Sequence, residues 1–280
     1  MQIVLTGHKG LIGSYLKKRL EAEEHNIVVS IDKRAGSDLN FLENLDLHGK
    51  VDLVIHAAAH CKINQSVEDP LTTYENNVSG TFKVLEFCRK NKVPKIIFFS
   101  SSRILSPEKN PYTASKIYGE ELCKAYSQCY GIEYIIIRPS TVYGPFWDLA
   151  KRLMHIFIVN ALTNKDIEIY GNPETKTLDF TYIDDFIDGV MLALKNPGWN
   201  KEYDLSGNEE QNLLELAQFI IAQTKSRSKI LIKGEEVAQP QKVSVDISAI
   251  AKLGYTPKVL LREGVVKTIE WYRDYLKDKD

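Results

Sequence analysis

Short apolar runs alternate with longer amphipathic stretches along the first half of this chain. The short runs are apolar at nearly every position, which predicts strands that are buried on both faces. The longer stretches repeat apolar residues three and four apart, the spacing of one helix face. Strands are expected at residues 3–6, 27–31, 51–56, 96–99 and 134–137, and helices at residues 11–21, 80–91 and 112–130. Strands that alternate with helices predict a parallel sheet with helices on both faces.

The alternation of apolar runs and amphipathic stretches becomes less regular after residue 145. Helices are expected at residues 149–163, 183–195, 212–224 and 260–276, and short strands near residues 167–170 and 179–181. We therefore expect an α/β protein with a doubly wound (Rossmann) parallel sheet, in which residues 1–145 form a dinucleotide-binding domain. Residues 146–280 are expected to form mainly a smaller substrate-binding lobe, from which some segments return to the main sheet.

Composition and charge exclude several classes of protein. The 280 residues are 44% hydrophobic and 26% charged, with a net charge of -1. A nearly neutral chain offers no strong field to nucleic acid or to an anionic membrane, so neither is an expected partner. No apolar run reaches the roughly 18 residues that span a bilayer, and the first residues lack the pattern of a signal peptide. We expect a cytoplasmic protein.

The cysteines and histidines do not form a pattern that is typical of metal sites. The four cysteines are scattered, which predicts free thiols in a reducing compartment. His56 and His60 are four residues apart, but no carboxylate cluster follows them. No metal site is expected.

Three glycines follow the first expected strand and open the first expected helix. Gly7, Gly10 and Gly13 are spaced three apart, which suits a tight turn, a close approach of the backbone to pyrophosphate, and close packing of helix on strand. Asp32 ends the second expected strand, where its carboxylate can accept from the adenosine ribose hydroxyls of NAD. Lys33, which follows it, suits the 2′-phosphate of NADP instead. We expect NAD, with NADP as the alternative.

A tyrosine and a lysine lie four residues apart in the third expected helix. Residues at this spacing share a helix face, so Lys116 is expected to lower the pKa of Tyr112 and to hold the nicotinamide ribose. Tyr112 is then expected to exchange a proton with a substrate hydroxyl or carbonyl while a hydride moves to or from the cofactor. Ser100, Ser101 and Ser102, at the end of the fourth expected strand, offer a hydroxyl that would polarise the same oxygen.

These motifs, in this order, resemble the extended short-chain dehydrogenase/reductase family of nucleotide-sugar epimerases, dehydratases and reductases. The resemblance runs over nearly the whole chain. Besides the glycine loop and the Tyr-x-x-x-Lys pair, it rests on residues 51–59, 76–81, 99–102, 138–145, 179–185, 253–257 and 268–272.

The family's functional positions carry over to matching residues. The resemblance implies three catalytic residues, Tyr112, Lys116 and Ser102, of which Ser102 matches the family's catalytic Ser or Thr. The cofactor-binding residues that it implies, together with the glycine loop, are Gly7, Gly10, Leu11, Ile12, Gly13, Asp32, Lys33, Ala57, Ala58, Ala59, Asn77, Ser100, Tyr112, Lys116 and Pro139. The expected substrate contacts are Lys62, Ser101, Ser102, Arg103, Tyr112, Thr141 and Lys176. Asn77 matches an asparagine that helps to order the lysine.

The chain departs from the family at the substrate end. Leu178 and Gln239 replace arginines that grip the nucleotide diphosphate in relatives. The nearby Lys176 and Lys242 could substitute as point charges, or the substrate's head group differs. Ser102 is followed by Arg103 and not by the acidic pair of the dehydratases, which argues against a 4,6-dehydratase.

Three functions are compatible with this sequence. The favoured hypothesis is an NAD-dependent nucleotide-sugar 4-epimerase that oxidises C4 transiently and returns the hydride to the other face. The alternative is an NAD(P)H-dependent reductase of a nucleotide-linked 4-keto sugar, and a minor alternative is a non-catalytic dinucleotide-sensing protein. The resemblance also implies a homodimer, with apolar contacts expected from Phe82, Leu85, Tyr126 and Tyr130.

Overall fold

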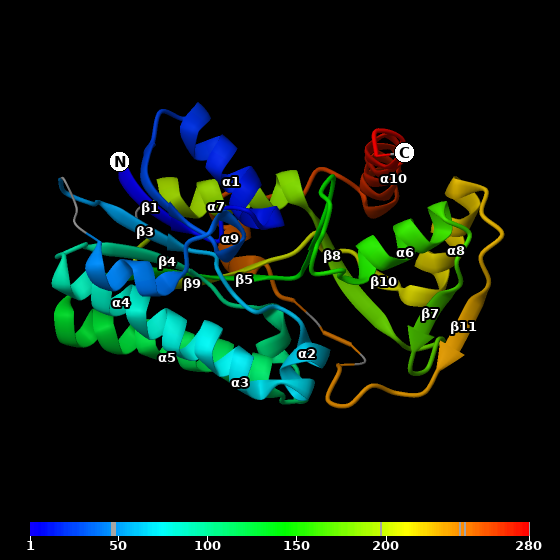
Figure 1. Ribbon diagram of the computed structural model, residues 1–280, viewed down its shortest axis with the longest axis horizontal. Helices are drawn as coiled ribbons and strands as arrows, with labels where there is room; N and C mark the ends of the chain where they lie inside the picture. The colour runs from blue at the N-terminus through cyan, green and yellow to red at the C-terminus, as the bar shows by residue number, and fades with distance from the viewer. Residues whose placement is uncertain (46–48, 197, 241, 244, 280) are drawn as a thin grey trace.

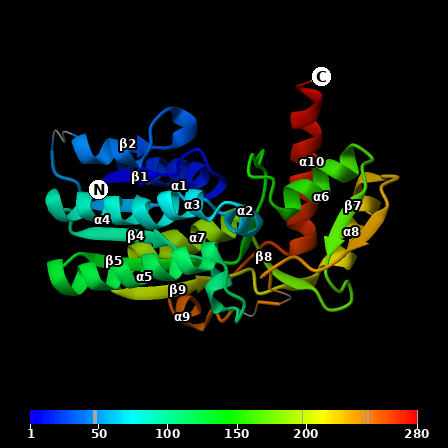
Figure 2. The same cartoon turned by 60° about the horizontal axis from the view of Figure 1, so that its bottom comes forward.

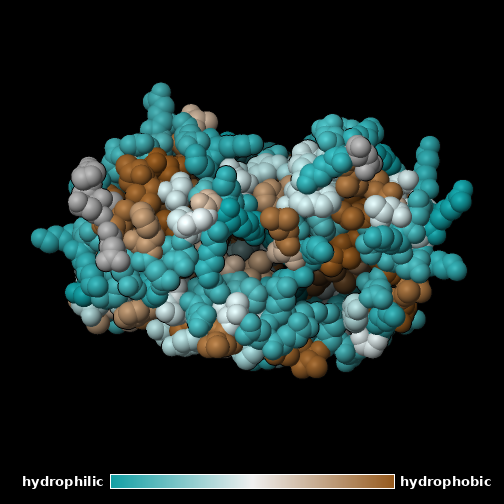
Figure 3. Space-filling model, in the orientation of Figure 1, coloured by the Kyte–Doolittle hydropathy of each residue, from teal (hydrophilic) through white to brown (hydrophobic). Residues whose placement is uncertain are grey.

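A computed structural model describes residues 1–45, 49–196, 198–240, 242–243 and 245–279. It contains a larger part around a parallel sheet and a smaller lobe that lies beyond one end of the strands (Figure 1). The surface is hollowed between the two parts (Figure 3). None of the helices in the described ranges has both the length and the apolar run needed to cross a membrane.

The main sheet has six parallel strands in the order β2-β1-β3-β4-β5-β9. Its strands are β1 (Gln2–Thr6), β2 (Asn26–Ile31), β3 (Leu53–His56), β4 (Lys95–Phe99), β5 (Glu133–Pro139) and β9 (Lys201–Leu205). The first five are the strands that the apolar runs predicted, so the doubly wound α/β fold is confirmed. The order reverses beside β1, and a sheet of this kind binds ligands outside the carboxyl ends of its strands at such a point.

Helices cover both faces of this sheet. α1 (Leu11–Ala22) and α7 (Ile183–Lys195) lie on one face, and α4 (Gly80–Lys90) and α5 (Pro111–Tyr130) lie side by side on the other (Figure 2). Alternate strand residues point to opposite faces. Thus Ile3 and Leu5 join the core under α1 and α7, whereas Val4 joins the core under α4 and α5.

The two-helix face corrects one expectation about a dimer contact. Leu85 and Tyr126 are only 0% and 7% exposed, because both pack between the helices and the sheet. They are therefore not available as surface contacts. Phe82 and Tyr130 are 45% and 54% exposed on the same helices.

Local signals determine where α5 begins and ends. The Asn110 side chain accepts from the Thr113 amide, and the Thr113 hydroxyl accepts from the Asn110 amide, which forms a capping box. Pro111 occupies the first helical position, and Gly131 ends the helix with a left-handed φ of 70°. The first turn of α5 therefore presents Tyr112 and the next turn presents Lys116, as their spacing predicted.

After residue 145 the chain alternates between the two parts. α7 and β9 return to the main sheet, where β9 pairs with β5. Two small sheets form beside it, β10-β8-β6 and β11-β7. Their strands are β6 (Thr141–Tyr143), β7 (Ile167–Tyr170), β8 (Thr177–Tyr182), β10 (Glu210–Asn212) and β11 (Ile230–Lys233). The smaller lobe also holds α6 (Leu153–Leu162), α8 (Leu213–Thr224) and α10 (Leu261–Lys277).

The four cysteines are free thiols, as their spacing predicted. Cys88 and Cys123 are buried, and burial raises the pKa of both thiols. Cys61 and Cys129 are exposed. Within the described ranges, no three His, Cys, Asp or Glu side chains converge as metal ligands would.

Candidate active site

The glycine loop brings backbone against backbone at the start of α1. Gly7 has a φ of +79°, and a Cβ there would lie 2.6 Å from the Ala58 amide nitrogen. A Cβ on Gly13 would lie 2.1 Å from the Gly7 carbonyl oxygen. Both positions therefore require glycine, and the absence of side chains leaves the amino end of α1 open to a phosphate group.

A cavity of about 790 Å³ opens over this loop. This volume falls in the range of cofactor sites. Ten of the expected cofactor-binding residues line it, namely Gly7, Gly10, Leu11, Ile12, Gly13, Asp32, Lys33, Ala57, Ala58 and Ala59. The residues present therefore fit a dinucleotide.

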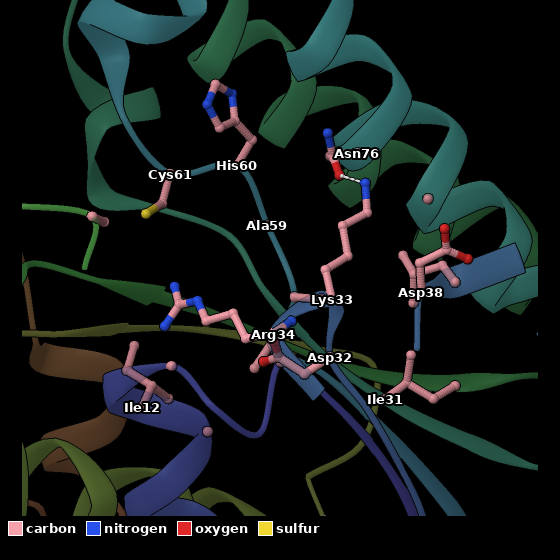
Figure 4. A pocket seen from close by; sticks show the side chains of 18 of the residues that line it. Ile12, Ile31, Asp32, Lys33, Arg34, Asp38, Ala59, His60, Cys61 and Asn76 are labelled. Atoms are coloured by element: carbon pink, nitrogen blue, oxygen red, sulfur yellow. Dashed lines mark hydrogen bonds between the residues drawn. The ribbon is translucent and has the colours of Figure 1, made fainter. Parts of the chain in front are cut away.

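Hydrogen bonds orient the charged groups at the far end of this cavity (Figure 4). One oxygen of the Asp32 carboxylate accepts from the Lys9 amide at 2.9 Å, and the other accepts from the Arg34 amide at 2.9 Å. Lys33 points away from Asp32 and donates to the Asn76 side chain at 2.7 Å. The carboxylate is thus held at the end of β2, where the ribose of NAD is expected.

A second cavity of about 750 Å³ adjoins the first. Both cavities are lined by Ile12, Ala57, Ala59, Cys61 and Arg152. The second holds nearly all the remaining expected residues, namely Lys62, Ser100, Ser101, Arg103, Tyr112, Lys116, Pro139, Thr141 and Lys176. Tyr112 and Lys116 therefore line a second cavity that shares these five lining residues with the cofactor cavity.

Tyr112 and Lys116 are almost completely buried, at 7% and 4% exposure. The Lys116 Nζ donates to the Phe99 carbonyl oxygen at 2.8 Å. Burial lowers the pKa of Lys116 to about 8 and raises the pKa of Tyr112 to about 12. Opposing influences on the pKa of Tyr112 include a hydrogen bond with Ser101 and the charges of Arg103 and Arg152. The charges of Arg103 and Arg152 therefore favour the phenolate, although burial outweighs them.

The serine run divides between the cavity and the protein interior. All three serines are buried, but only Ser100 and Ser101 line the second cavity, and Ser102 lies outside its lining. The Ser101 hydroxyl also accepts from the Arg103 amide at 3.2 Å and so begins the short helix η4 (Ser102–Leu105). The Ser100 hydroxyl is buried without a hydrogen-bond partner among the described residues. The structure thus brings Ser101, and not Ser102, to Tyr112.

Asn77 lies outside both cavity linings and acts on the backbone around them. It is 2% exposed in the π-helical segment η3 (Tyr74–Ser79). Its amide accepts from the His60 amide at 2.7 Å and donates to the His60 carbonyl oxygen at 2.9 Å. It also donates to the Ser115 hydroxyl at 3.0 Å. Asn77 therefore joins the segment after β3 to the first turns of α5, and it contacts the neighbour of Lys116.

The substitutions at the substrate end have different consequences. Leu178, Lys176 and Gln239 all line the second cavity. Lys176 is buried, and its Nζ donates to the Tyr170 carbonyl oxygen at 2.6 Å. Lys242 instead pairs with Glu210 at 2.9 Å and does not line the cavity. Of the two lysines expected to replace the arginines, Lys176 is the one in position.

Arg152 is a cavity residue that the sequence reasoning missed. It precedes α6 and lines both cavities. Its Nε donates to the Asp148 carboxylate at 2.6 Å. The available signal was a basic residue at the start of an expected helix, which is too common to single out a site.

Gln239 lines the second cavity and contacts the cofactor-binding part. Its side-chain amide donates to Asn64, which lies on α2 (Ile63–Glu68) of the cofactor-binding part. Asn110 donates to the Ala238 carbonyl oxygen at 3.1 Å. The segment before residue 240 therefore connects the two parts of the molecule across the cavity.

Comparison with known sequences identifies the family. Residues 3–205 match the sequence model of the NAD dependent epimerase/dehydratase family. The chain belongs to this family. The expected family resemblance and the expected cofactor, NAD, are thereby confirmed.

Individual members of the family match over nearly their whole length. A putative UDP-glucose 4-epimerase of Methanocaldococcus jannaschii is 29% identical over 97% of this chain and 98% of its own. The crystal structure of UDP-glucuronic acid 4-epimerase from Bacillus cereus, in complex with UDP-glucuronic acid and NAD, is 25% identical with a TM-score of 0.87. It covers 98% of this chain and 100% of that chain. UDP-glucose 4-epimerase from Thermus thermophilus, in complex with NAD, shares the fold with a TM-score of 0.89 at 24% identity, covering 98% and 99%.

Proposed function

We propose that this protein is an NAD-dependent 4-epimerase of nucleotide sugars. The observation that carries the proposal is the position of Tyr112 and Lys116, which are buried and line a second cavity that adjoins the cofactor cavity. The relatives named as 4-epimerases, which match over nearly their whole length, support it.

In the proposed mechanism, Tyr112 accepts the proton of the C4 hydroxyl in its phenolate form, which burial disfavours. Bound NAD supplies the hydride acceptor and, in the return step, the hydride donor. Arg103 and Arg152 favour the phenolate by their charge, and Ser101 places a hydroxyl beside the same oxygen. Tyr112 then returns the proton after the keto sugar has presented its other face. Lys116 is proposed to bind the nicotinamide ribose.

The residues after the serine run argue against a dehydratase. Loss of water from a sugar needs groups that remove and donate protons beside the leaving hydroxyl. Arg103 and Ile104 occupy the two positions after Ser102, and neither is a carboxylate. The proposed chemistry therefore ends with hydride return.

Replacing Tyr112 by Phe tests the proposal. The purified protein with retained or added NAD is incubated with nucleotide sugars, and C4 epimers are quantified by chromatography. We expect epimer formation by the wild type with no net change in NADH. The Tyr112→Phe variant should be slower by roughly 10²- to 10⁴-fold, because a positioned acid/base group is lost.

Two controls separate the alternatives. Tyr118→Phe changes a half-exposed tyrosine of the same helix and should leave turnover unchanged. Stoichiometric NADH oxidation with a 4-keto sugar, in place of epimerisation, would assign a reductase instead. Full turnover by Tyr112→Phe would contradict the role of Tyr112 in either reaction.

A further inference from the structure

Two arginines line the second cavity together with Tyr112, and neither donates or accepts the proton in the proposed transfer. Arg103 lies in η4, just after β4, and Arg152 lies just before α6. Both line the second cavity, and both charges act on the pKa of Tyr112. They come from different parts of the molecule.

Arg103 lacks an acidic partner. Its only side-chain hydrogen bond among the described residues goes to the Thr141 hydroxyl, at a long 3.4 Å. No carboxylate lies within 4.0 Å of its guanidinium in the described ranges. Asp179, an acid near enough to influence Arg103, is bonded to the Ser206 hydroxyl instead. A half-buried guanidinium without a counter-ion is unfavourable, and an anionic ligand would supply the missing partner.

Asp148 holds the Arg152 guanidinium in place and leaves its two terminal nitrogens without a partner among the described residues. Its Nε donates to Asp148 at 2.6 Å, and its backbone amide donates to the same carboxylate oxygen at 3.2 Å. Its two terminal nitrogens have no hydrogen-bond partner among the described residues. A carboxylate fits two such N–H groups in a bidentate manner. Asp148 thus orients Arg152 and leaves the end of its guanidinium available.

The position beside Tyr112 indicates which substrate group is anionic. Tyr112 is proposed to act at C4 of the sugar, whereas the nucleotide diphosphate is attached to C1 across the ring. An anion that is bound near Tyr112 therefore lies at the opposite end of the sugar from the diphosphate. C5 is the ring carbon next to C4, and its substituent C6 carries a negative charge when it is a carboxylate.

We propose that Arg103 and Arg152 bind the C6 carboxylate of a nucleotide-linked hexuronic acid. This inference rests on the proposed function, because it uses Tyr112 to place C4. It assigns the substrate class of the second cavity and leaves the diphosphate to other groups, such as Lys176. Arg103 and Arg152 are then specificity-determining residues.

Binding measurements on the NAD-loaded protein test this assignment. The ligands are UDP-glucuronic acid, UDP-glucose and UDP, of which the first two differ only in a carboxylate against a hydroxymethyl group. We expect the wild type to bind UDP-glucuronic acid at least about 10-fold more tightly than UDP-glucose. Arg103→Gln should lower the affinity for UDP-glucuronic acid by roughly 10- to 100-fold, because a hydrogen bond to a charged group contributes about that much to binding. The same substitution should change the affinities for UDP-glucose and UDP by less than about threefold.

Further variants control for folding and for charge. Arg152→Gln should also lower the affinity for UDP-glucuronic acid relative to UDP-glucose. Arg103→Lys should keep part of the affinity for UDP-glucuronic acid, because lysine keeps the charge but lacks the planar guanidinium. Arg227→Gln removes an exposed arginine outside both cavity linings and should change none of the three affinities.

Two outcomes would overturn the inference. One is equal affinity of the wild type for the two sugars. The other is an equal loss of affinity for all three ligands in the Arg103→Gln variant, which would place Arg103 at the diphosphate. The result is separable from the proposed function. If the protein epimerises UDP-glucose but does not prefer UDP-glucuronic acid, only the inference is contradicted. If UDP-glucuronic acid binds in a manner that depends on Arg103 but is not epimerised, only the proposed function is contradicted.

Discussion

At the scale of single residues, Lys116 is a cation that the fold buries beside the reacting phenol. Its ammonium has a backbone acceptor, the Phe99 carbonyl oxygen, and no carboxylate within 4.0 Å in the described ranges. Burial lowers its pKa from 10.5 to about 8. This shift corresponds to a stability cost of up to about 3 kcal/mol near neutral pH, since one unit is about 1.4 kcal/mol.

Replacing Lys116 by Met should therefore stabilise the fold while abolishing turnover. The folded-state pKa lies below the unfolded value, so the cost of the charged lysine is fully present below about pH 8 and disappears as the pH rises toward 10.5. Urea unfolding of both proteins should show a stability difference of up to about 3 kcal/mol at neutral pH that shrinks at higher pH. A difference that does not change with pH would show that burial of the lysine charge is not its cause.

Ser101 and Ser102 differ in what their hydroxyls face, and kinetics can distinguish them. Ser101 lines the cavity and lowers the pKa of Tyr112, whereas Ser102 lies outside the lining. We expect Ser101→Ala to lower kcat by roughly 10- to 100-fold and Ser102→Ala to lower it by less than about threefold. Steady-state rates of both variants decide between them. The reverse order would restore the role that the family resemblance gives to Ser102.

At the scale of elements, the close approach of α1 to the glycine loop controls cofactor binding. A Cβ at Gly13 would overlap the Gly7 carbonyl oxygen, so the helix must move away from the phosphate position. The affinity for NAD should therefore be at least about 10-fold lower in Gly13→Ala. Ser14→Ala adds no Cβ and removes only a hydroxyl that bonds to the Leu11 carbonyl oxygen. Fluorescence titration with NADH should leave Ser14→Ala close to the wild type, and unchanged binding by Gly13→Ala would contradict the packing argument.

At the scale of the whole molecule, the face formed by α4 and α5 carries exposed apolar side chains. Phe82, Tyr118 and Tyr130 are 45%, 39% and 54% exposed there. The predicted homodimer would bury this face. Light scattering should give twice the chain mass of 31.9 kDa, and Phe82→Asp combined with Tyr118→Asp should give the monomer mass. Ile232→Asp, an exposed position on β11, is the matched control and should remain dimeric. A monomeric wild type would refute the prediction.

Much of the large part of the molecule was predictable from the sequence. The strands β1 to β5 and the helices α1, α4 and α5 follow from apolar periodicity, whereas α2 was not predicted. β9 was not predicted, because it mixes charged and apolar residues and is stabilised by pairing with β5. β10 and β6 have three residues each and exist through their pairing with β8.

The sequence by itself determined the fold class, the cofactor loop and the Tyr112–Lys116 pair, because each depends on residues that are close along the chain. The tertiary structure decided which serine faces Tyr112, that Lys176 and not Lys242 lies in the cavity, and that Arg103 and Arg152 lie near the same phenol. These facts depend on segments that meet only after β4, α5 and the start of α6 have packed around one cavity. Burial and unpaired charge exist only in that packed state, and they give the two arginines their proposed role.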